Sequence, residues 1–95
     1  MSERSIVFSP RAMARLEAIS DYLLQQHLSK KFVVEYLADL ENWLNRVLLE
    51  FPNAGTSMPN LGLGLRRVVY KRYSFIYRIK GQKIEILTIY RDNLP

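Results

Sequence analysis

The chain has 95 residues, contains no cysteine and carries a formal net charge of +5. This length fits one domain, expected over residues 1–95, and the lack of cysteine excludes disulfides, zinc–thiolate sites and cysteine nucleophiles. The positive charge is one-sided, because eight Lys and Arg but only two Asp and Glu lie from Asn60 onward, and this favours an acidic partner.

The composition predicts neither a leader nor a membrane segment. No stretch approaches the roughly 18 apolar residues that a membrane span requires. The first residues also lack the apolar run and the cleavage pattern of a signal peptide. We therefore expect a cytoplasmic protein without membrane association.

The first third of the chain predicts a short strand followed by a helix. Residues 4–8 (RSIVF) favour the strand. Ser9 is a suitable N-cap and Pro10 fits the first helical position. Apolar residues then recur every three or four positions, which predicts a helix over residues 10–27.

A second helix is predicted over residues 30–51, with Ser29 as its cap. Its apolar residues also recur at spacings of three and four, and Pro52 ends it because proline disfavours a helical conformation in the preceding residue. Only a few residues separate the two helices, so we expect them to form an antiparallel hairpin.

The remainder of the chain predicts a loop followed by three strands. Residues 52–64 hold two prolines and three glycines, a composition typical of loops. Strands are predicted at 65–70, 73–80 and 83–90, joined by two-residue turns that suit hairpins. The order β-α-α-β-β-β is that of an α+β fold, in which a helical hairpin packs on a largely antiparallel sheet.

One face of the predicted sheet is expected to bind a partner. The last strand (IEILTIY) is apolar on both faces, whereas a single helical hairpin covers one face only. Apolar and aromatic side chains among arginines on the second face are typical of a binding surface. The alternative is that a few exposed apolar side chains are ordinary.

The residues of hydrolases and metalloenzymes do not occur at useful spacings. The one histidine, His27, lies at a predicted helix end, where a surface role is the usual one. Gly62 and Gly64 lack the residues that complete a phosphate-binding loop. Acids such as Asp39 lie on the polar side of the second helix, where solvated charge is expected. We expect no cofactor and no metal.

A group of basic and aromatic side chains on the predicted sheet remains. Arginine binds phosphates and carboxylates in bidentate fashion, and tyrosine stacks on bases or fills apolar grooves. The group is compatible with RNA and with an acidic peptide; alternatively, its members only pack the strands and keep an edge soluble. The candidate binding residues are Arg66, Arg67, Arg72, Tyr73, Tyr77, Arg78, Tyr90 and Arg91.

Over essentially its whole length the chain resembles toxins of the RelE/ParE superfamily, the toxic half of type II toxin–antitoxin pairs. The resemblance rests on SPRA at 9–12, on FP at 51–52 before a glycine-containing loop, and on LRR at 65–67, YSFIYRI at 73–79 and IEILTIYR at 84–91. It implies the fold predicted above, a cognate antitoxin as partner and a hetero-oligomer with that antitoxin.

The superfamily resemblance implies one of two activities. RelE-like members cleave mRNA on the ribosome without a metal, whereas ParE-like members are not nucleases and poison DNA gyrase. Ser74 stands where the nucleases often carry an arginine, which removes a stabiliser of the phosphoryl transition state. Residues 92–95 also lack the usual downstream tyrosine and closing helix. We therefore expect a ParE-like gyrase poison.

Two alternatives stay open from the sequence. The first is a ribosome-dependent endoribonuclease acting on ribosome and mRNA, for which the resemblance implies Arg67, Arg78, Tyr90 and Arg91 as acid, base and phosphate-binding groups. Arg78 lies on the same strand face as Ser74 and is a substitute for the missing arginine. The second is an inactive toxin fold retained for protein binding.

Overall fold

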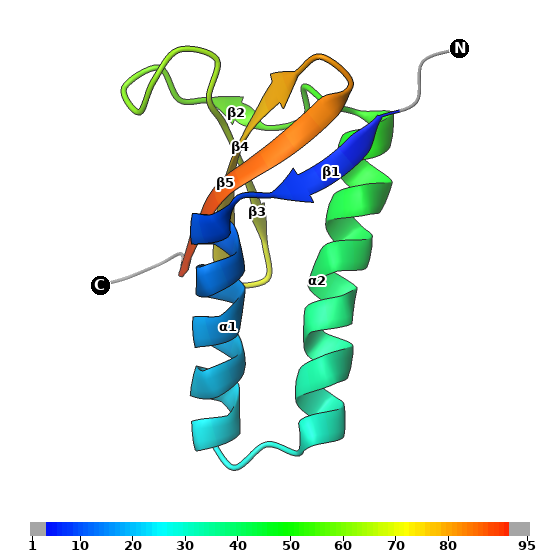
Figure 1. Ribbon diagram of the computed structural model, residues 1–95, viewed down its shortest axis with the longest axis vertical. Helices are drawn as coiled ribbons and strands as arrows, with labels where there is room; N and C mark the ends of the chain where they lie inside the picture. Colours follow the sequence, from blue (N-terminus) through cyan, green and yellow to red (C-terminus); the bar gives the residue numbers. More distant parts are fainter. Residues whose placement is uncertain (1–3, 92–95) are drawn as a thin grey trace.

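A helical hairpin covers one face of a five-stranded sheet in the computed structural model, which describes residues 4–91 (Figure 1). The elements are β1 (Ser5–Phe8), α1 (Pro10–Gln25), α2 (Lys30–Glu50), β2 (Thr56–Ser57), β3 (Arg66–Tyr70), β4 (Tyr73–Lys80) and β5 (Lys83–Arg91). The predicted α+β fold is confirmed, and the predicted element boundaries lie close to the observed ones.

The strand order in the sheet is β1-β5-β4-β3-β2. β3, β4 and β5 form the predicted antiparallel meander, and β1 pairs with β5 in parallel. β2 was not predicted: Thr56 and Ser57 pair with Arg67 and Arg66 at the edge of the sheet. Two polar residues inside a proline- and glycine-rich loop carry no strand pattern, so only the pairing with β3 makes them a strand.

Ser9 joins the start of α1 to the sheet. Its Oγ accepts a hydrogen bond from the Ala12 amide at 3.1 Å, as the predicted N-cap should. The same hydroxyl donates to the Leu87 carbonyl at 2.8 Å, and the Ser9 amide donates to the Ile86 carbonyl at 2.9 Å. Ser29 caps α2 in the predicted way. The position of α1 is thereby tied to the middle of β5.

The core lies between the hairpin and the face of the sheet that the hairpin covers. Phe75 and Tyr77 of β4 point into it and are fully buried. The other buried members of this cluster are Ala12, Ile19, Leu23, Val33, Leu40, Leu44, Leu48, Val68, Tyr73, Ile84, Ile86 and Ile89. They come from both helices and from three strands, so removal of this apolar surface from water holds the two layers together.

A β-bulge changes which face the apolar residues of β5 occupy. Ile76 pairs with Thr88 and Tyr77 pairs with Ile86, which leaves Leu87 as an extra residue. Because side chains alternate along a strand, the extra residue brings Ile86 and Ile89 to the same, covered face. Of the residues expected to make β5 apolar on both faces, Ile84, Ile86 and Ile89 thus share the covered face, whereas Tyr90 lies on the other face.

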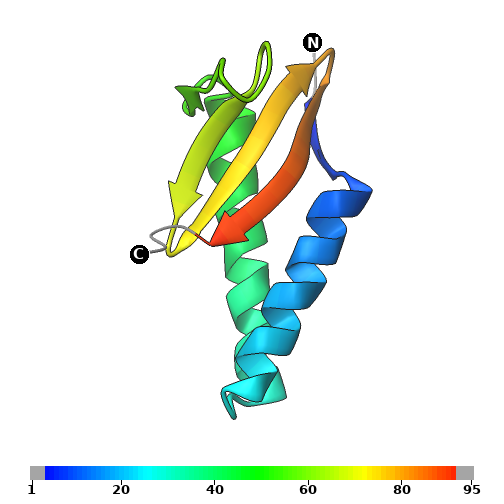
Figure 2. The ribbon, with the colours of Figure 1, turned by 90° about the vertical axis from the view of Figure 1, so that its left-hand side faces the viewer.

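Within residues 4–91, no helix lies on the second face of the sheet. Figure 2 shows α1 and α2 on one side of the strands only, and both helices extend past the end of the sheet. We call this second face the open face. The strand register places on it Ser5, Val7, Thr56, Arg67, Val69, Ser74, Ile76, Arg78, Lys80, Lys83, Glu85, Thr88 and Tyr90.

Candidate functional site

The sheet separates the eight residues that were predicted to form one binding surface. Three of them lie on the open face, four lie on the helix side and one lies in the β3–β4 turn. The open face carries Arg67, Arg78 and Tyr90, the helix side carries Arg66, Tyr73, Tyr77 and Arg91, and the turn carries Arg72. A single surface made of all eight is therefore excluded by the strand register.

Tyr77 and Arg66 hold the loop that follows α2. Tyr77 is 0% exposed, and its hydroxyl donates to the Pro52 carbonyl at 2.7 Å and accepts from the Gly55 amide at 2.9 Å. Burial raises the pKa of this hydroxyl. Arg66 donates to the Gly55 carbonyl at 2.7 Å. Tyr77 thus lies out of a partner's reach, because its alternation along β4 places it in the core.

Tyr73 is also mainly a core residue, with 6% of its surface exposed. Its ring meets that of Tyr36 edge to face, with the centroids 6.4 Å apart. Burial raises the pKa of the Tyr73 hydroxyl, so this group is protonated at neutral pH. Its remaining exposed surface lines a groove described below.

Two residues of the open face are more buried than the sequence suggested. Ile76 is 3% exposed and Ser74 is 0% exposed, although no helix lies on this face. Arg67 donates from Nε to the Ser74 hydroxyl at 2.9 Å. Neighbouring side chains of the sheet therefore bury both residues, and the exposed apolar side chains of the open face are Val7, Val69 and Tyr90.

Arg78 forms an ion pair with Glu85 on the adjacent strand. The Arg78 Nε lies 2.7 Å from the Glu85 Oε1, and both side chains are partly exposed. The carboxylate offsets the charge of Arg78, so this arginine is a weaker phosphate ligand than its position in the sequence suggested.

Arg91 lies on the helix side, next to α1. Its Nη1 donates to the Tyr22 hydroxyl at 3.2 Å, and the guanidinium lies 5.4 Å from the centre of the Tyr22 ring. The hydrogen bond to Tyr22 raises the pKa of Arg91. Of the four residues implied for a nuclease, Arg91 is thus separated by the sheet from Arg67 and Arg78.

A groove of about 300 Å³ lies between α1 and the end of β5. It brings together three predicted residues, Tyr73, Tyr90 and Arg91, with residues of α1 that the sequence analysis missed. The complete lining is Arg15, Ala18, Ile19, Tyr22, Tyr73, Ile89, Tyr90 and Arg91. A usable signal existed, because residues 15, 18 and 22 are spaced by three and four and so share one helix face.

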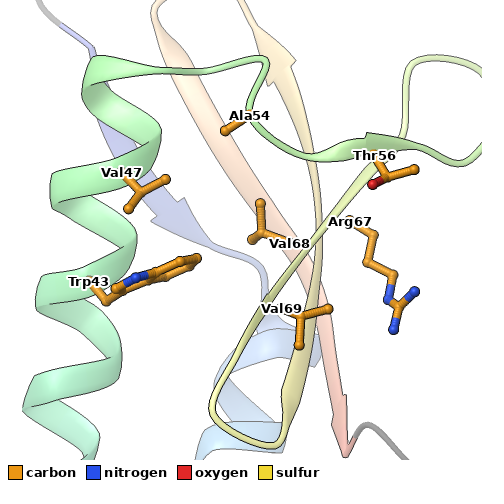
Figure 3. Close-up of a pocket in the computed structure, with 7 residues that line it drawn as sticks. All are labelled: Trp43, Val47, Ala54, Thr56, Arg67, Val68 and Val69. Atoms are coloured by element: carbon orange, nitrogen blue, oxygen red, sulfur yellow. The ribbon is translucent and has the colours of Figure 1, made fainter.

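A second hollow of about 360 Å³ lies between α2 and the strands β2 and β3. Figure 3 shows Trp43 and Val47 of α2 facing Val68 of β3 across it, whereas the Arg67 side chain extends away from α2. The lining consists of Trp43, Val47, Ala54, Thr56, Arg67, Val68 and Val69. The guanidinium of Arg67 therefore does not point into this hollow.

Asp39 connects α2 to the β3–β4 turn. Its Oδ2 accepts a hydrogen bond from the Tyr70 hydroxyl at 2.7 Å and lies 3.0 Å from the Lys71 Nζ. The bond from Tyr70, followed by that from Lys71, lowers the pKa of Asp39. Trp43 stacks on Tyr70 with the ring centroids 4.5 Å apart. The Asp39 side chain stays about half exposed, as expected of a solvated charge, but folding brings the turn onto α2 and adds partners that the sequence did not predict.

Two further properties concern residues 4–91. In this range no group of three or more His, Cys, Asp and Glu is placed to hold a metal ion. No helix in the same range has the length and apolarity needed to cross a membrane. The tail at 92–95, which contributed to the ParE-like expectation, lies outside the described residues.

Comparison with known proteins relates this fold to one family. The family model described as the ParE toxin of the type II toxin–antitoxin system parDE matches residues 6–93. A solved structure from a chromosomal ParDE toxin–antitoxin system of P. aeruginosa is similar with a TM-score of 0.78 and 25% identity, covering 95% of this chain and 97% of that chain. A search of curated proteins produced no match.

Proposed function

The chain belongs to the ParE toxin family of type II toxin–antitoxin systems, and on that premise we propose that it poisons DNA gyrase in the bacterial cytoplasm and is neutralised by a cognate antitoxin. The observation that carries this proposal is the family match over residues 6–93. Poisoning of gyrase would arrest growth.

The arrangement of the candidate catalytic residues supports binding rather than RNA cleavage. A metal-free nuclease needs its acid, base and phosphate-binding groups around one phosphate. Here Arg91 lies on the helix side, while Arg67 and Arg78 lie on the open face. Arg78 is also paired with Glu85, and Ser74 is fully buried.

A toxin that acts by binding needs exposed side chains rather than a reactive group. Arg67, Arg72 and Tyr90 remain candidates for contact with the target, because each keeps exposed surface. Ser74 orients Arg67 through the 2.9 Å hydrogen bond, which reduces the side-chain entropy lost on binding.

A supercoiling assay tests the proposal. The purified chain should inhibit ATP-dependent supercoiling of relaxed plasmid by gyrase and should increase the amount of linear plasmid trapped by detergent and protease. Added antitoxin should restore supercoiling. Undiminished supercoiling at a large molar excess of the chain would contradict the gyrase proposal, and cleavage of mRNA in a translation extract would assign the chain to the ribosome instead.

A further inference from the structure

The open face carries a group of basic side chains next to the β4–β5 turn. Arg78 and Lys80 of β4 and Lys83 of β5 lie on this face, together with Ser5 and Glu85. We call these five residues the basic corner. Figure 2 shows the β4–β5 turn at the opposite end of the molecule from the α1–α2 turn. The basic corner therefore lies away from the part of the helical hairpin that extends past the sheet.

Two lysines of the basic corner oppose each other. Lys80 pairs with Lys83 in the strand register, with only Gly81 and Gln82 between them in the chain. Like charges directly opposite on antiparallel strands repel each other. Both lysines are exposed, and within residues 4–91 neither has an ion-pair partner. The tight turn thus holds two free positive charges together, and an anion bound between them would relieve the repulsion.

The spacing of the cations suits a row of phosphates. Arg78 and Lys80 are two residues apart on β4, which corresponds to about 6.8 Å. Duplex DNA carries one phosphate per about 3.4 Å of helix axis along each strand. Ser5 adds a hydroxyl, a group that also donates to phosphate oxygens. The carboxylate of Glu85 is engaged by the Arg78 Nε at 2.7 Å, so it offsets Arg78 and leaves the two lysines uncompensated.

The basic corner lacks the features that hold a protein or a single-stranded nucleic acid. On the open face of residues 4–91, Val7 is the exposed apolar side chain beside the corner, whereas protein interfaces are centred on clusters of apolar and aromatic anchors. The exposed ring of Tyr90 lies about 23 Å along β5 from Lys83, so bases at the corner have no ring to stack on. Contact with the phosphates of a duplex remains, and such contact is independent of sequence.

We propose that the basic corner binds the phosphate backbone of duplex DNA without regard to its sequence. Lys80 and Lys83 would contact neighbouring phosphates, and Arg78 would add a weaker contact because Glu85 offsets its charge. Release of condensed counterions would supply the affinity. On the proposed function, the duplex is the DNA that gyrase holds, so the toxin would contact enzyme and DNA together. Only this last assignment rests on the gyrase proposal.

Two double substitutions test whether the corner or the overall charge binds DNA. Lys80→Gln/Lys83→Gln removes the opposed lysines, whereas Lys30→Gln/Lys31→Gln removes two exposed lysines at the start of α2, next to the α1–α2 turn. Fluorescence anisotropy of a labelled duplex with the full chain, without gyrase, should show affinity lowered about tenfold or more by the first variant, with the salt slope reduced by about two. The α2 variant should change both little. Equal effects of the two variants would overturn the proposal; thermal melts check that both are folded.

A gain of affinity tests the same site from the other direction. Glu85→Gln removes the carboxylate that offsets Arg78 and should strengthen binding to the duplex about threefold or more, because one more cation becomes available to a phosphate. Glu41→Gln changes the net charge equally at an exposed position of α2 and should have little effect. An affinity that Glu85→Gln leaves unchanged or lowers would contradict the proposed contact.

Competition between ligands distinguishes duplex DNA from other polyanions. Unlabelled duplexes of unrelated sequence should displace the labelled duplex equally well, since only the backbone is contacted. Single-stranded RNA of the same length and polyglutamate of the same total charge should displace it less well. More effective displacement by RNA would assign the corner to RNA, and more effective displacement by polyglutamate would assign it to an acidic protein segment; either result overturns the proposal.

The supercoiling assay separates this inference from the gyrase proposal. Lys80→Gln/Lys83→Gln should require a several-fold higher concentration for half-inhibition of gyrase, whereas Lys30→Gln/Lys31→Gln should match the parent chain. Undiminished inhibition by the first variant would show that poisoning does not use the DNA contact and would overturn the assignment to gyrase-held DNA. If the chain binds the duplex through the basic corner but leaves supercoiling intact, the gyrase proposal fails and the DNA surface stands.

Discussion

The two faces of the sheet use the same residue types in different ways. On the open face, Arg67 is hydrogen-bonded to Ser74 and Arg78 is paired with Glu85, and Ile76 is buried by its neighbours. These side chains therefore find their hydrogen-bonding and packing partners within the sheet. On the face without a helix, Ile76 is therefore buried and Arg67 and Arg78 are hydrogen-bonded within the sheet.

On the helix side, the divergence of α1 and β5 leaves a groove whose floor is apolar and whose rim is cationic. Arg91 is oriented by Tyr22, and neither it nor Arg15 has a carboxylate in the groove lining. The comparison teaches that basic and aromatic side chains line an accessible groove only where the backbone leaves space beside them.

The largest difference between the two faces is expected in the stability of buried isoleucines. Ile89→Ala should lower the free energy of unfolding by about 2–5 kcal/mol. Ile89 belongs to the core cluster, where the surrounding atoms only partly fill the cavity that the shortened side chain leaves. Ile76→Ala, on the open face, should cost about 1–2 kcal/mol, since the flexible side chains that cover it can move in. Urea unfolding of both variants measures the difference, and equal losses would show that the open face is packed as rigidly as the core.

A smaller effect is expected from the Tyr77 hydroxyl. Tyr77→Phe should cost about 1–3 kcal/mol, because the Pro52 carbonyl and the Gly55 amide lose a buried partner. Chemical denaturation gives the loss, and proteolysis within residues 52–64 should also become faster. An unchanged free energy of unfolding would mean that water replaces the hydroxyl and that the loop does not depend on it.

The ion pair on the open face should contribute still less. A double-mutant cycle with Arg78→Ala and Glu85→Ala should yield a coupling energy of about 0.2–1 kcal/mol, because the pair is partly exposed. The coupling should shrink at high salt. A larger, salt-independent coupling would show that the open face is less accessible to solvent than its side-chain exposure indicates.

The smallest effect concerns Asp39 and depends on pH. Its pKa is lowered in the folded state from an ordinary value of 3.8, so its contribution to stability is complete above that value and is lost as the pH falls through the folded pKa. Urea unfolding should therefore show Asp39→Asn less stable than the parent chain at pH 7 and the gap narrowed at pH 3. A gap that stays constant with pH would assign the effect to hydrogen bonding alone.

Local signals in the sequence were sufficient for most of the architecture. Ser9 and Ser29 start the helices, apolar spacings of three and four define their buried faces, and apolar and aromatic runs bounded by short turns define β3 to β5. Each signal lies within a few residues of the element that it predicts. The superfamily resemblance rests on the same segments, and the family match confirms its ParE branch.

The distribution of side chains between faces could not be predicted in the same way. The extra residue at Leu87 moves Ile86 and Ile89 to one face, and its effect depends on pairing with β4. On the open face, Ser74 is the hydrogen-bond partner of Arg67, and Glu85 is the ion-pair partner of Arg78. Each partner likewise lies on the adjacent strand.

The sequence by itself determined every element except β2, the order of these elements, the basic character of the last third and the family, because these depend on local propensity and composition. Only the tertiary structure decided that the candidate residues divide between two faces and that Arg15 and Tyr22 of α1 meet Arg91 of β5. The physical reason is that strand register and the angle between a helix and a sheet arise from contacts between residues far apart in the chain, such as those of Ser9 with Ile86 and Leu87.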